Sequence, residues 1–313
     1  MKKDILIKIV LSMLVCSLIT PLTANAAEIN KTDYQENRNV IIDSNSENSK
    51  VICNECNGLK NPAIDNLKSI PGKWIQASDG RWWYKHNDGT YTTNGWEYID
   101  GKWYYFNAEG WMKTGWVKVK NEWYYLESNG AMRLTDLFQN GSTYTFSTSG
   151  SLNSTILGVE RQRQEKDNWC WAASAVMVGR YDLPAEKQTV NQTKVVLEVK
   201  GEVVNEGGSG EEEARGINIS SRNTKNATAI NSALSFNDIL NTIDNRHPFI
   251  VRMKWNSGGG HAIVCGGYRI SDNNIWITDP WDQTASQYYS YSGMTQGMTI
   301  ATGTGRYTGS VTY

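Results

Sequence analysis

The stretch QEKDNWCWAASAVMV, residues 164–178, decides how the second half of this 313-residue chain folds. A polar run gives way to small and apolar residues, and Asp167 and Asn168 are N-cap candidates, so a helix is predicted to start close to Cys170. At that position the N–H groups of the first helical turn stabilise a thiolate, the reactive form of cysteine. The stretch therefore predicts a nucleophilic cysteine at the start of a helix.

A thiolate nucleophile needs a neighbouring base, and the chain has three histidines. His86 lies among aromatic repeats and is expected to be an ordinary surface or turn residue, and His247 directly precedes a proline. His261 follows three glycines and opens an apolar run that ends at Tyr268. A strand would hold this ring rigidly, and the glycines let a substrate come close. His261 is therefore the predicted base.

The third member of such a site is an acceptor that orients the imidazole. Asp279 ends the next β-type run, and Asp282 is the alternative acceptor. Gln164 precedes Cys170 by six residues, and its side-chain amide and the backbone N–H of Cys170 are candidates for an oxyanion hole. The predicted catalytic residues are Cys170, His261, Asp279 and Gln164.

This order of residues resembles that of papain-like cysteine proteases. The segments NWCWAAS, GGGHAIVCGGY and ITDPW are similar to the small bacterial members related to bacteriocin-leader (double-glycine) peptidases and to secreted effector proteases. The resemblance spans about residues 158–290 and implies a Cys170–His261–Asp279 triad with Gln164 in the oxyanion hole, cleaving peptide bonds through an acyl-enzyme. Leader processing is not expected, because the leader peptidases are usually fused to membrane transporters and no such segment is seen.

The remaining pattern of this half predicts an α+β papain-like domain, with an N-terminal helix and a C-terminal antiparallel sheet. A capping-box-like start at 235–238 predicts a helix that ends at His247, and a buried strand follows at 249–253. Residues 201–229 are rich in Gly, Glu and Asn and are interpreted mostly as exposed loop or short helix, a candidate lining for a substrate cleft.

Three residues near the predicted site have structural alternatives. Trp169 and Trp171 either wall a substrate groove or pack against the sheet. Cys265 shares a strand face with His261 by alternation and is predicted to be a buried core thiol.

From Lys73 to about Gly150 the chain repeats itself with a period near 20. Aromatic triplets start at residues 82, 103 and 123, Gly-Trp pairs at 95 and 115, and glycines close units at 89, 110, 130 and 150. Such a period predicts stacked β-hairpins that bury their aromatic residues against neighbours, an all-β hairpin-repeat solenoid. The last unit, 137–150, has Tyr144 but no Trp and is predicted to be a degenerate cap.

The pattern Gly-Trp, Gly-Lys-Trp-Tyr-Tyr-Phe, Gly resembles the choline-binding or cell-wall-binding repeats of Gram-positive surface proteins. In that family aromatic side chains of adjacent hairpins form a cage for a quaternary ammonium group. The resemblance implies a partner in the bacterial cell wall, either a choline-bearing teichoic acid or a glycan. The cage candidates are Trp96, Trp103, Trp116, Trp123 and Tyr125; the alternative is that these rings only form the stacking core of the solenoid.

The N-terminal part predicts export. Lys2 and Lys3 precede an apolar run and the small-residue sequence Ala24-Asn25-Ala26, which is typical of a secretory signal peptide cleaved near Ala26. An uncleaved membrane anchor is disfavoured because Lys8 interrupts a short apolar run. The polar composition of the next segment predicts a disordered spacer. Its Cys53 and Cys56 are interpreted as a local disulfide or free thiols rather than zinc ligands, since no second Cys/His pair stands nearby.

The predicted organisation is therefore a signal peptide (1–26), a disordered spacer (27–70), cell-wall-binding repeats (71–153) and a papain-like domain (154–313). A formal net charge of −1 without a long Lys/Arg block disfavours nucleic acid as a partner. No metal or organic cofactor is expected, and no membrane association after signal cleavage. The sequence predicts a secreted, wall-associated cysteine peptidase that acts on a protein or peptide. The alternatives are a peptidoglycan amidase or endopeptidase, and a non-enzymatic adhesin with a silent papain-like domain.

Overall fold

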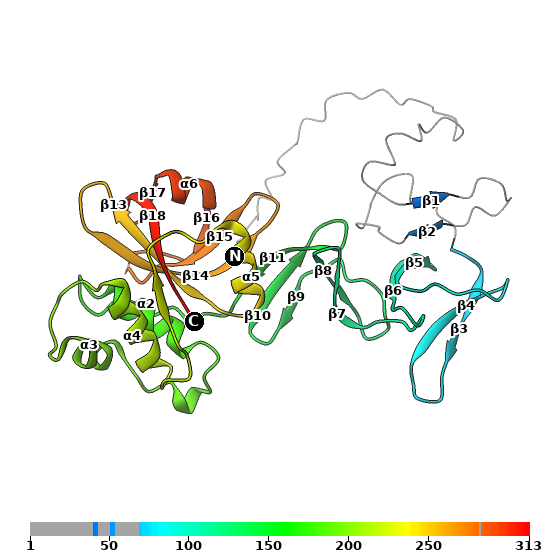
Figure 1. The fold of residues 1–313 in the computed structure, drawn as a ribbon, viewed down its shortest axis with the longest axis horizontal. Coiled ribbons are helices and arrows are strands. Elements are labelled where there is room, and N and C mark those ends of the chain that lie inside the picture. The colour runs from blue at the N-terminus through cyan, green and yellow to red at the C-terminus, as the bar shows by residue number, and fades with distance from the viewer. Residues whose placement is uncertain (1–39, 43–50, 54–68, 282) are drawn as a thin grey trace, which may run out of the picture.

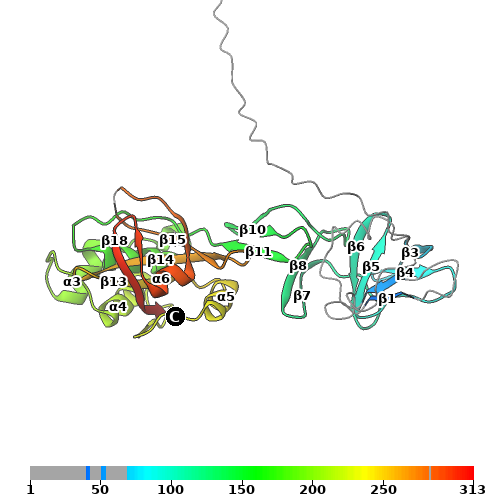
Figure 2. The ribbon, with the colours of Figure 1, turned by 90° about the horizontal axis from the view of Figure 1, so that it is seen from above.

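The computed structural model describes residues 40–42, 51–53, 69–281 and 283–313. They form two parts that lie end to end, a row of β-hairpins and a mixed helix–sheet part (Figures 1 and 2). The predicted signal peptide and most of the predicted spacer lie outside the described residues, and so do the side chains of Cys53 and Cys56. Within the predicted spacer, β1 (Val40–Ile42) and β2 (Val51–Cys53) pair antiparallel, which the sequence analysis did not anticipate.

The hairpin repeats predicted from the period are confirmed. The four hairpins are β3–β4 (Gly72–Gln76, Trp82–His86), β5–β6 (Gly95–Ile99, Lys102–Phe106), β7–β8 (Gly115–Val119, Glu122–Leu126) and β9–β10 (Leu137–Gln139, Ser142–Phe146). The last three have two-residue turns in which both residues have positive φ. That conformation matches the right-handed twist of the strands, so the turns close each hairpin tightly.

Tryptophans join each hairpin to the next and account for the period. Each contacts a tyrosine across its own hairpin, with ring centroids 5.1–5.2 Å apart, and a tyrosine of the following hairpin at 4.8–4.9 Å. Aromatic pairs at these separations add about 0.5–1.5 kcal/mol beyond the area they bury. The three sets are Trp74 with Tyr84 and Tyr104, Trp96 with Tyr105 and Tyr124, and Trp116 with Tyr125 and Tyr144.

Two of the glycines that close the units lie against a methionine of the preceding unit. Gly130 has φ +84°, and a Cβ there would lie 2.2 Å from the sulfur of Met112. Gly150 stands in the same relation to Met132. Because any side chain would strain the backbone and displace the methionine, glycine recurs at this position.

The C-terminal half is a twisted antiparallel sheet with helices on both faces. Its strands are β11 (Leu152–Ile156), β12 (Thr228–Ile230), β13 (Phe249–Trp255), β14 (Gly260–Arg269), β15 (Asn274–Thr278), β16 (Gln287–Ser290), β17 (Met298–Ile300) and β18 (Gly303–Thr312). Its helices are α2 (Cys170–Arg180), η1 (Ala185–Lys187), α3 (Gln192–Lys200), α4 (Gly210–Ser220), α5 (Phe236–Asp244) and α6 (Tyr291–Gln296). The main strand order is β12-β18-β13-β14-β11-β10-β9, with β15 on the other edge of β14.

Strand alternation divides the core between the two faces of the sheet. Ile250, Ala262 and Val264 face the cluster built on α2, α3 and α4. Val251 and Ile263 face the cluster that includes residues of α5 and α6. The helix predicted from Ser235 and the strand predicted at 249–253 are both present. No helix in the described part of the chain has the length and apolar character needed to cross a membrane.

Two expectations about these elements are corrected, the capping of α2 and the terminal position of the last hairpin. Helix α2 starts at Cys170 as predicted, but neither Asp167 nor Asn168 caps it, because Trp169 occupies the N-cap position; the side chain of Asn168 donates to the carbonyl of Asn205 instead. Residues 201–229 contain an eleven-residue helix, α4, which begins with a capping box of Ser209 and Glu212.

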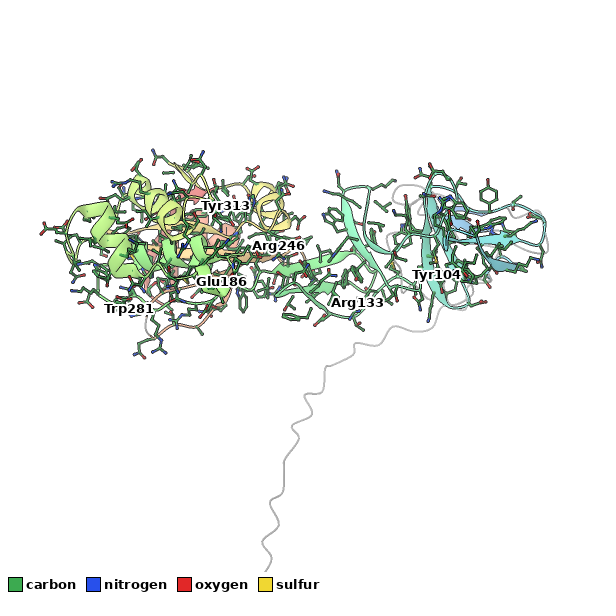
Figure 3. All side chains as sticks on the ribbon, turned by 90° about the horizontal axis from the view of Figure 1, so that it is seen from below. Tyr104, Arg133, Glu186, Arg246, Trp281 and Tyr313 are labelled. Carbon is green, nitrogen blue, oxygen red and sulfur yellow. The ribbon has the colours of Figure 1, made fainter. Side chains whose placement is uncertain are left out.

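The last hairpin is not a terminal cap. Strand β10 pairs with β11, and β11 pairs with β14, so the sheet runs without a break from the last hairpin into the C-terminal half. Arg246 strengthens this junction by donating to Ser142 Oγ and to the carbonyl of Asn140. Figure 3 shows Arg246 on the side that faces the hairpins, with Arg133 and then Tyr104 further along them.

Candidate active site

Cys170 is the first residue of α2 and is partly exposed. The N–H groups of a first helical turn have no acceptor within the helix and point toward whatever lies at its start. The neighbouring tryptophans are each 1% exposed and belong to the core. Their indole N–H groups donate outward, from Trp169 to the carbonyl of Val204 at 2.7 Å and from Trp171 to that of Glu206 at 2.9 Å. The helix start is thereby fixed to the loop 201–209.

His261 lies near the start of β14 and is 8% exposed. Its Nε2 lies 2.8 Å from Asp279 Oδ1, and Cys170 is its second hydrogen-bonding partner. Because Nε2 is engaged with the carboxylate, Nδ1 is the nitrogen that faces the sulfur. The ring of Trp255 stacks on the imidazole, with centroids 6.0 Å apart, and covers one of its faces.

The charge state of His261 is set by opposing effects. Burial lowers the pKa of the imidazole, but the hydrogen bonds with Asp279 and Cys170 outweigh burial and raise that pKa to about 9. The ring therefore carries a proton at neutral pH. A protonated imidazole beside Cys170 is the arrangement that stabilises a thiolate.

Asp279 is held by three donors and is 3% exposed. Besides the imidazole, its Oδ1 accepts from the backbone N–H of Trp281 at 2.8 Å, and its Oδ2 accepts from Thr302 Oγ1 at 3.2 Å. Arg161 donates to the carbonyl of Asp279 at 2.7 Å and so fixes the backbone as well. Asp282, the alternative acceptor, lies outside the described residues.

Gln164 has a different environment from the one expected. Its Nε2 donates to the carbonyls of Lys166 at 3.0 Å and Asp167 at 2.8 Å, in the loop that leads to Cys170. Both amide hydrogens are thus directed at that loop, while its backbone N–H donates to Pro280 at 2.9 Å. In this arrangement Gln164 supports the loop and ties it to the segment after Asp279. Its part in an oxyanion hole stays a prediction that requires the amide to change partners.

Arg161, Trp255 and Thr302 also support the site and could not be selected from the sequence. None of them carries a local signal, since Arg161 lies 118 residues from Asp279 and Thr302 lies 23 residues from it. The histidines set aside are distant from this array. His247 packs on Tyr313, and His86 is buried rather than at the surface, with Nε2 2.8 Å from Glu97 Oε1. Cys265 is fully buried, and burial raises the pKa of its thiol to about 12.

A cleft of about 500 Å³ opens beside Cys170 and His261. Glycines form parts of two of its walls, Gly207 and Gly208 on the loop before α4 and Gly259 and Gly260 at the start of β14. The expectation that residues 201–229 line a cleft holds for this segment. The other lining residues are Trp171, Glu213, Arg252, Met253, Lys254, Ala262 and Thr308.

The five cage candidates fall into two groups. Trp96 and Trp103 are 1% and 9% exposed and lie in a repeat core with Tyr124. Trp116 and Trp123 line a hollow of about 300 Å³ at the junction with the C-terminal half, and Tyr125 contacts Trp116. Trp96 and Trp103 are therefore buried by packing, whereas Trp116 and Trp123 are partly accessible. Which of these rings contact a ligand stays a prediction.

Comparison with known families supports both halves. Residues 156–304 match the Peptidase_C39 like family, and residues 93–138 match the choline-binding repeat. The resemblance stated from the sequence is thereby confirmed, with choline-binding repeats followed by a Peptidase_C39-like domain. Among curated proteins, none matches the chain.

Several solved structures match over part of the chain. The modular Cpl-1 endolysin, solved with a peptidoglycan analogue, is 34% identical over 30% of each chain, with a TM-score of 0.26. CbpJ from Streptococcus pneumoniae TIGR4 is 37% identical over 29% of this chain and 31% of its own, with a TM-score of 0.25. The autolysin LytC from Streptococcus pneumoniae is 29% identical over 31% of this chain and 22% of its own, with a TM-score of 0.26. The match spans less than a third of each of these proteins.

Proposed function

We propose that this protein is a secreted cysteine peptidase that its repeats hold at the bacterial cell wall. The observation that carries the proposal is the array of Cys170, His261 and Asp279 at the edge of a cleft. A cysteine at a helix start, an imidazole and a buried carboxylate stand in the order that nucleophilic catalysis by a thiolate requires. The family match of residues 156–304 supports peptidase chemistry.

In the proposed reaction, the Cys170 sulfur attacks the carbonyl carbon of a peptide bond, and the oxygen becomes negatively charged. The backbone N–H of Cys170, at the start of α2, is the nearest donor for that charge. His261 gives its proton to the departing amine, which leaves an acyl-enzyme on Cys170. A water molecule then attacks the thioester while His261 takes a proton from it, and the acid product is released.

Asp279 acts on the imidazole alone in this scheme. Its hydrogen bond to Nε2 directs Nδ1 at the sulfur and stabilises the positive charge of the ring. Trp255 covers the ring and limits the access of water to it. No metal or organic cofactor has a part in these steps.

In this proposal the repeats attach the protein to the cell wall. Choline-binding repeats are associated with cell-wall polymers, so a choline-bearing teichoic acid or a glycan is the proposed partner. Trp116 and Trp123 are the more suitable place for a quaternary ammonium group, since they line a hollow and are half-buried, whereas Trp96 and Trp103 are buried.

The test uses the full chain with a mixed protein substrate and purified peptidoglycan in parallel. Cys170→Ala is compared with Cys265→Ala, which removes a thiol that is buried and remote from the cleft. Protein cleavage that is lost only in Cys170→Ala supports the proposal. Release of wall fragments instead would identify an amidase or endopeptidase, and no hydrolysis of either substrate would identify a silent domain.

A further inference from the structure

The cleft continues past Cys170 and His261 along a face of β13 that carries two cations. The register pairs Met253 with His261, so Arg252 and Lys254 lie on either side of the residue opposite the imidazole. By strand alternation these two side chains share the face on which Ala262 packs toward α2. With strands about 4.8 Å apart and a rise of about 3.3 Å per residue, the backbone of Arg252 lies about 6 Å from that of His261.

Arg252 is built into this wall. Its Nε lies 3.1 Å from Oε2 and 3.4 Å from Oε1 of Glu213 on α4. The Glu213 side chain is 3% exposed, while that of Arg252 is 30% exposed. In the described part of the chain, no hydrogen bond engages the two terminal nitrogens of Arg252. The guanidinium is therefore anchored at one edge and open at the other.

Two glycines make room for the guanidinium of Arg252. A Cβ at Gly210 would lie 3.1 Å from Arg252 Nη1, and one at Gly309 would lie 3.4 Å from it. Any larger residue at either position would crowd the terminal nitrogens. The backbone of these two buried glycines therefore positions the guanidinium, and Arg252 itself lines the cleft.

The surrounding charges leave this cation attractive to an anion. Burial raises the pKa of Glu213 to about 8, although Arg252 opposes that rise, so the carboxyl retains a proton through much of the neutral range. Lys254 adds a second positive charge to the cleft lining. Glu211 is the other acid near Arg252, and it is exposed to solvent on the first turn of α4.

We propose that Arg252 forms a carboxylate-binding subsite that takes an aspartate or glutamate side chain of the peptide substrate. The inference rests on the proposed peptidase function and adds a preference within it. A guanidinium whose two terminal NH2 groups have no other partner binds a carboxylate through paired hydrogen bonds. Since an extended peptide advances about 3.3 Å per residue, the acidic residue lies within about two positions of the cleaved bond.

The experiment presents matched peptide sets to the full chain. Each set carries Glu or Gln at one of the three positions on either side of the cut, with amidated C-termini, and cleavage is mapped by mass spectrometry. We expect wild type to prefer Glu over Gln at one position by about tenfold or more in kcat/KM. A parallel set with free C-termini distinguishes an acidic side chain from a chain-end carboxylate.

Two variants assign the preference to Arg252. In Arg252→Gln/Glu213→Gln both members of the pair become neutral amides of similar shape, so no charge is left buried and unpaired, and the preference for Glu is expected to disappear. Arg306→Gln removes an exposed cation from β18 that lines a different hollow, and the preference is expected to persist. A preference that survives in the double variant, or that is absent in wild type, would overturn the proposal.

A binding measurement separates this inference from the peptidase function. The same peptides are tested for retention on immobilised Cys170→Ala protein with and without the double substitution. Selective retention of Glu peptides without cleavage by wild type would uphold the subsite and refute the peptidase. Cleavage without any preference for Glu, in either hydrolysis or binding, would uphold the peptidase and refute the subsite.

Discussion

The substitution Asp279→Asn tests whether the buried carboxylate sets the charge of the His261 imidazole. An asparagine side chain fills the same space, and its oxygen still accepts from the imidazole N–H and from the backbone N–H of Trp281. What the variant loses is the negative charge beside His261. Hydrogen bonding to Asp279 is the largest of the effects that raise the pKa of His261 to about 9, so that pKa is expected to fall.

The expected loss of kcat/KM in Asp279→Asn follows from the kind of hydrogen bond that is weakened. A hydrogen bond to a charged group contributes about 1.5–3 kcal/mol, against about 1 kcal/mol for a neutral one. The difference of about 0.5–2 kcal/mol, at 1.36 kcal/mol per tenfold, corresponds to a loss of about two- to thirtyfold in kcat/KM. The protonated ring is also needed to give a proton to the leaving amine, so the pH dependence changes with the rate.

The sign of the pH dependence is fixed by the same pKa. In wild type, activity that depends on the imidazolium declines as the pH rises through about 9. The raised pKa also stabilises the folded state fully below the ordinary value of 6.5, and this contribution is lost as the pH rises through about 9. In Asp279→Asn both declines are expected at lower pH.

The assay is kcat/KM for a cleaved peptide as a function of pH, with active enzyme counted by alkylation of Cys170. Cys53→Ser and Cys56→Ser are introduced throughout so that these thiols do not react. Asp282→Asn is the matched control, because it removes the alternative acceptor three residues along the chain. An alkaline limb that stays unchanged in Asp279→Asn but moves in Asp282→Asn would show that the carboxylate has been assigned wrongly.

Three further predictions concern the supporting structure. Trp171→Phe removes the indole N–H that donates to Glu206, so the free energy of unfolding is expected to fall by about 1 kcal/mol and hydrogen exchange in the loop 201–209 to increase. The control Trp276→Phe, on strand β15, should leave that exchange unchanged. Gly130→Ala is expected to destabilise the repeats by about 1 kcal/mol or more, because φ is +84° and the new Cβ meets Met112; thermal unfolding should show this, while Ser128→Ala should have little effect. The raised pKa of Glu213 means that its contribution to stability is complete below the ordinary value of 4.5 and is lost as the pH rises through about 8; urea unfolding should show a smaller decline over that range in Glu213→Gln, and an equal decline would contradict this origin.

Features specified by local composition could be predicted from the sequence. The helix beginning at Cys170 follows from a run of small residues, and the hairpins follow from a period of aromatic residues and turn glycines. His261 could be selected because the glycines before it and the apolar run after it define a strand end. Each of these signals lies within a few neighbouring residues.

Features that depend on which of several partners a polar side chain takes could not be predicted in this way. Asn168 is a residue type that often caps helices, but Trp169 occupies the N-cap position of α2. Asn168 instead forms hydrogen bonds with Asn205, which lies 37 residues away. Gln164 has the spacing of an oxyanion donor, but its amide is used by the loop that follows it. The sequence contains the capping-box pattern of Ser209 and Glu212, but the glycines around it favoured a loop.

Strand β14 connects His261 to the repeats. His261 lies near its first residue, and Gly267 to Arg269 at its other end pair with β11, which in turn pairs with the last hairpin. Gly267 is needed here because a Cβ would lie 2.4 Å from the carbonyl of Thr155, so the two strands approach closely. Backbone hydrogen bonds, rather than a linker, therefore join the last repeat to the strand that carries His261. Because a strand ladder resists bending far more than a flexible linker does, the last hairpin is held in a fixed orientation relative to His261.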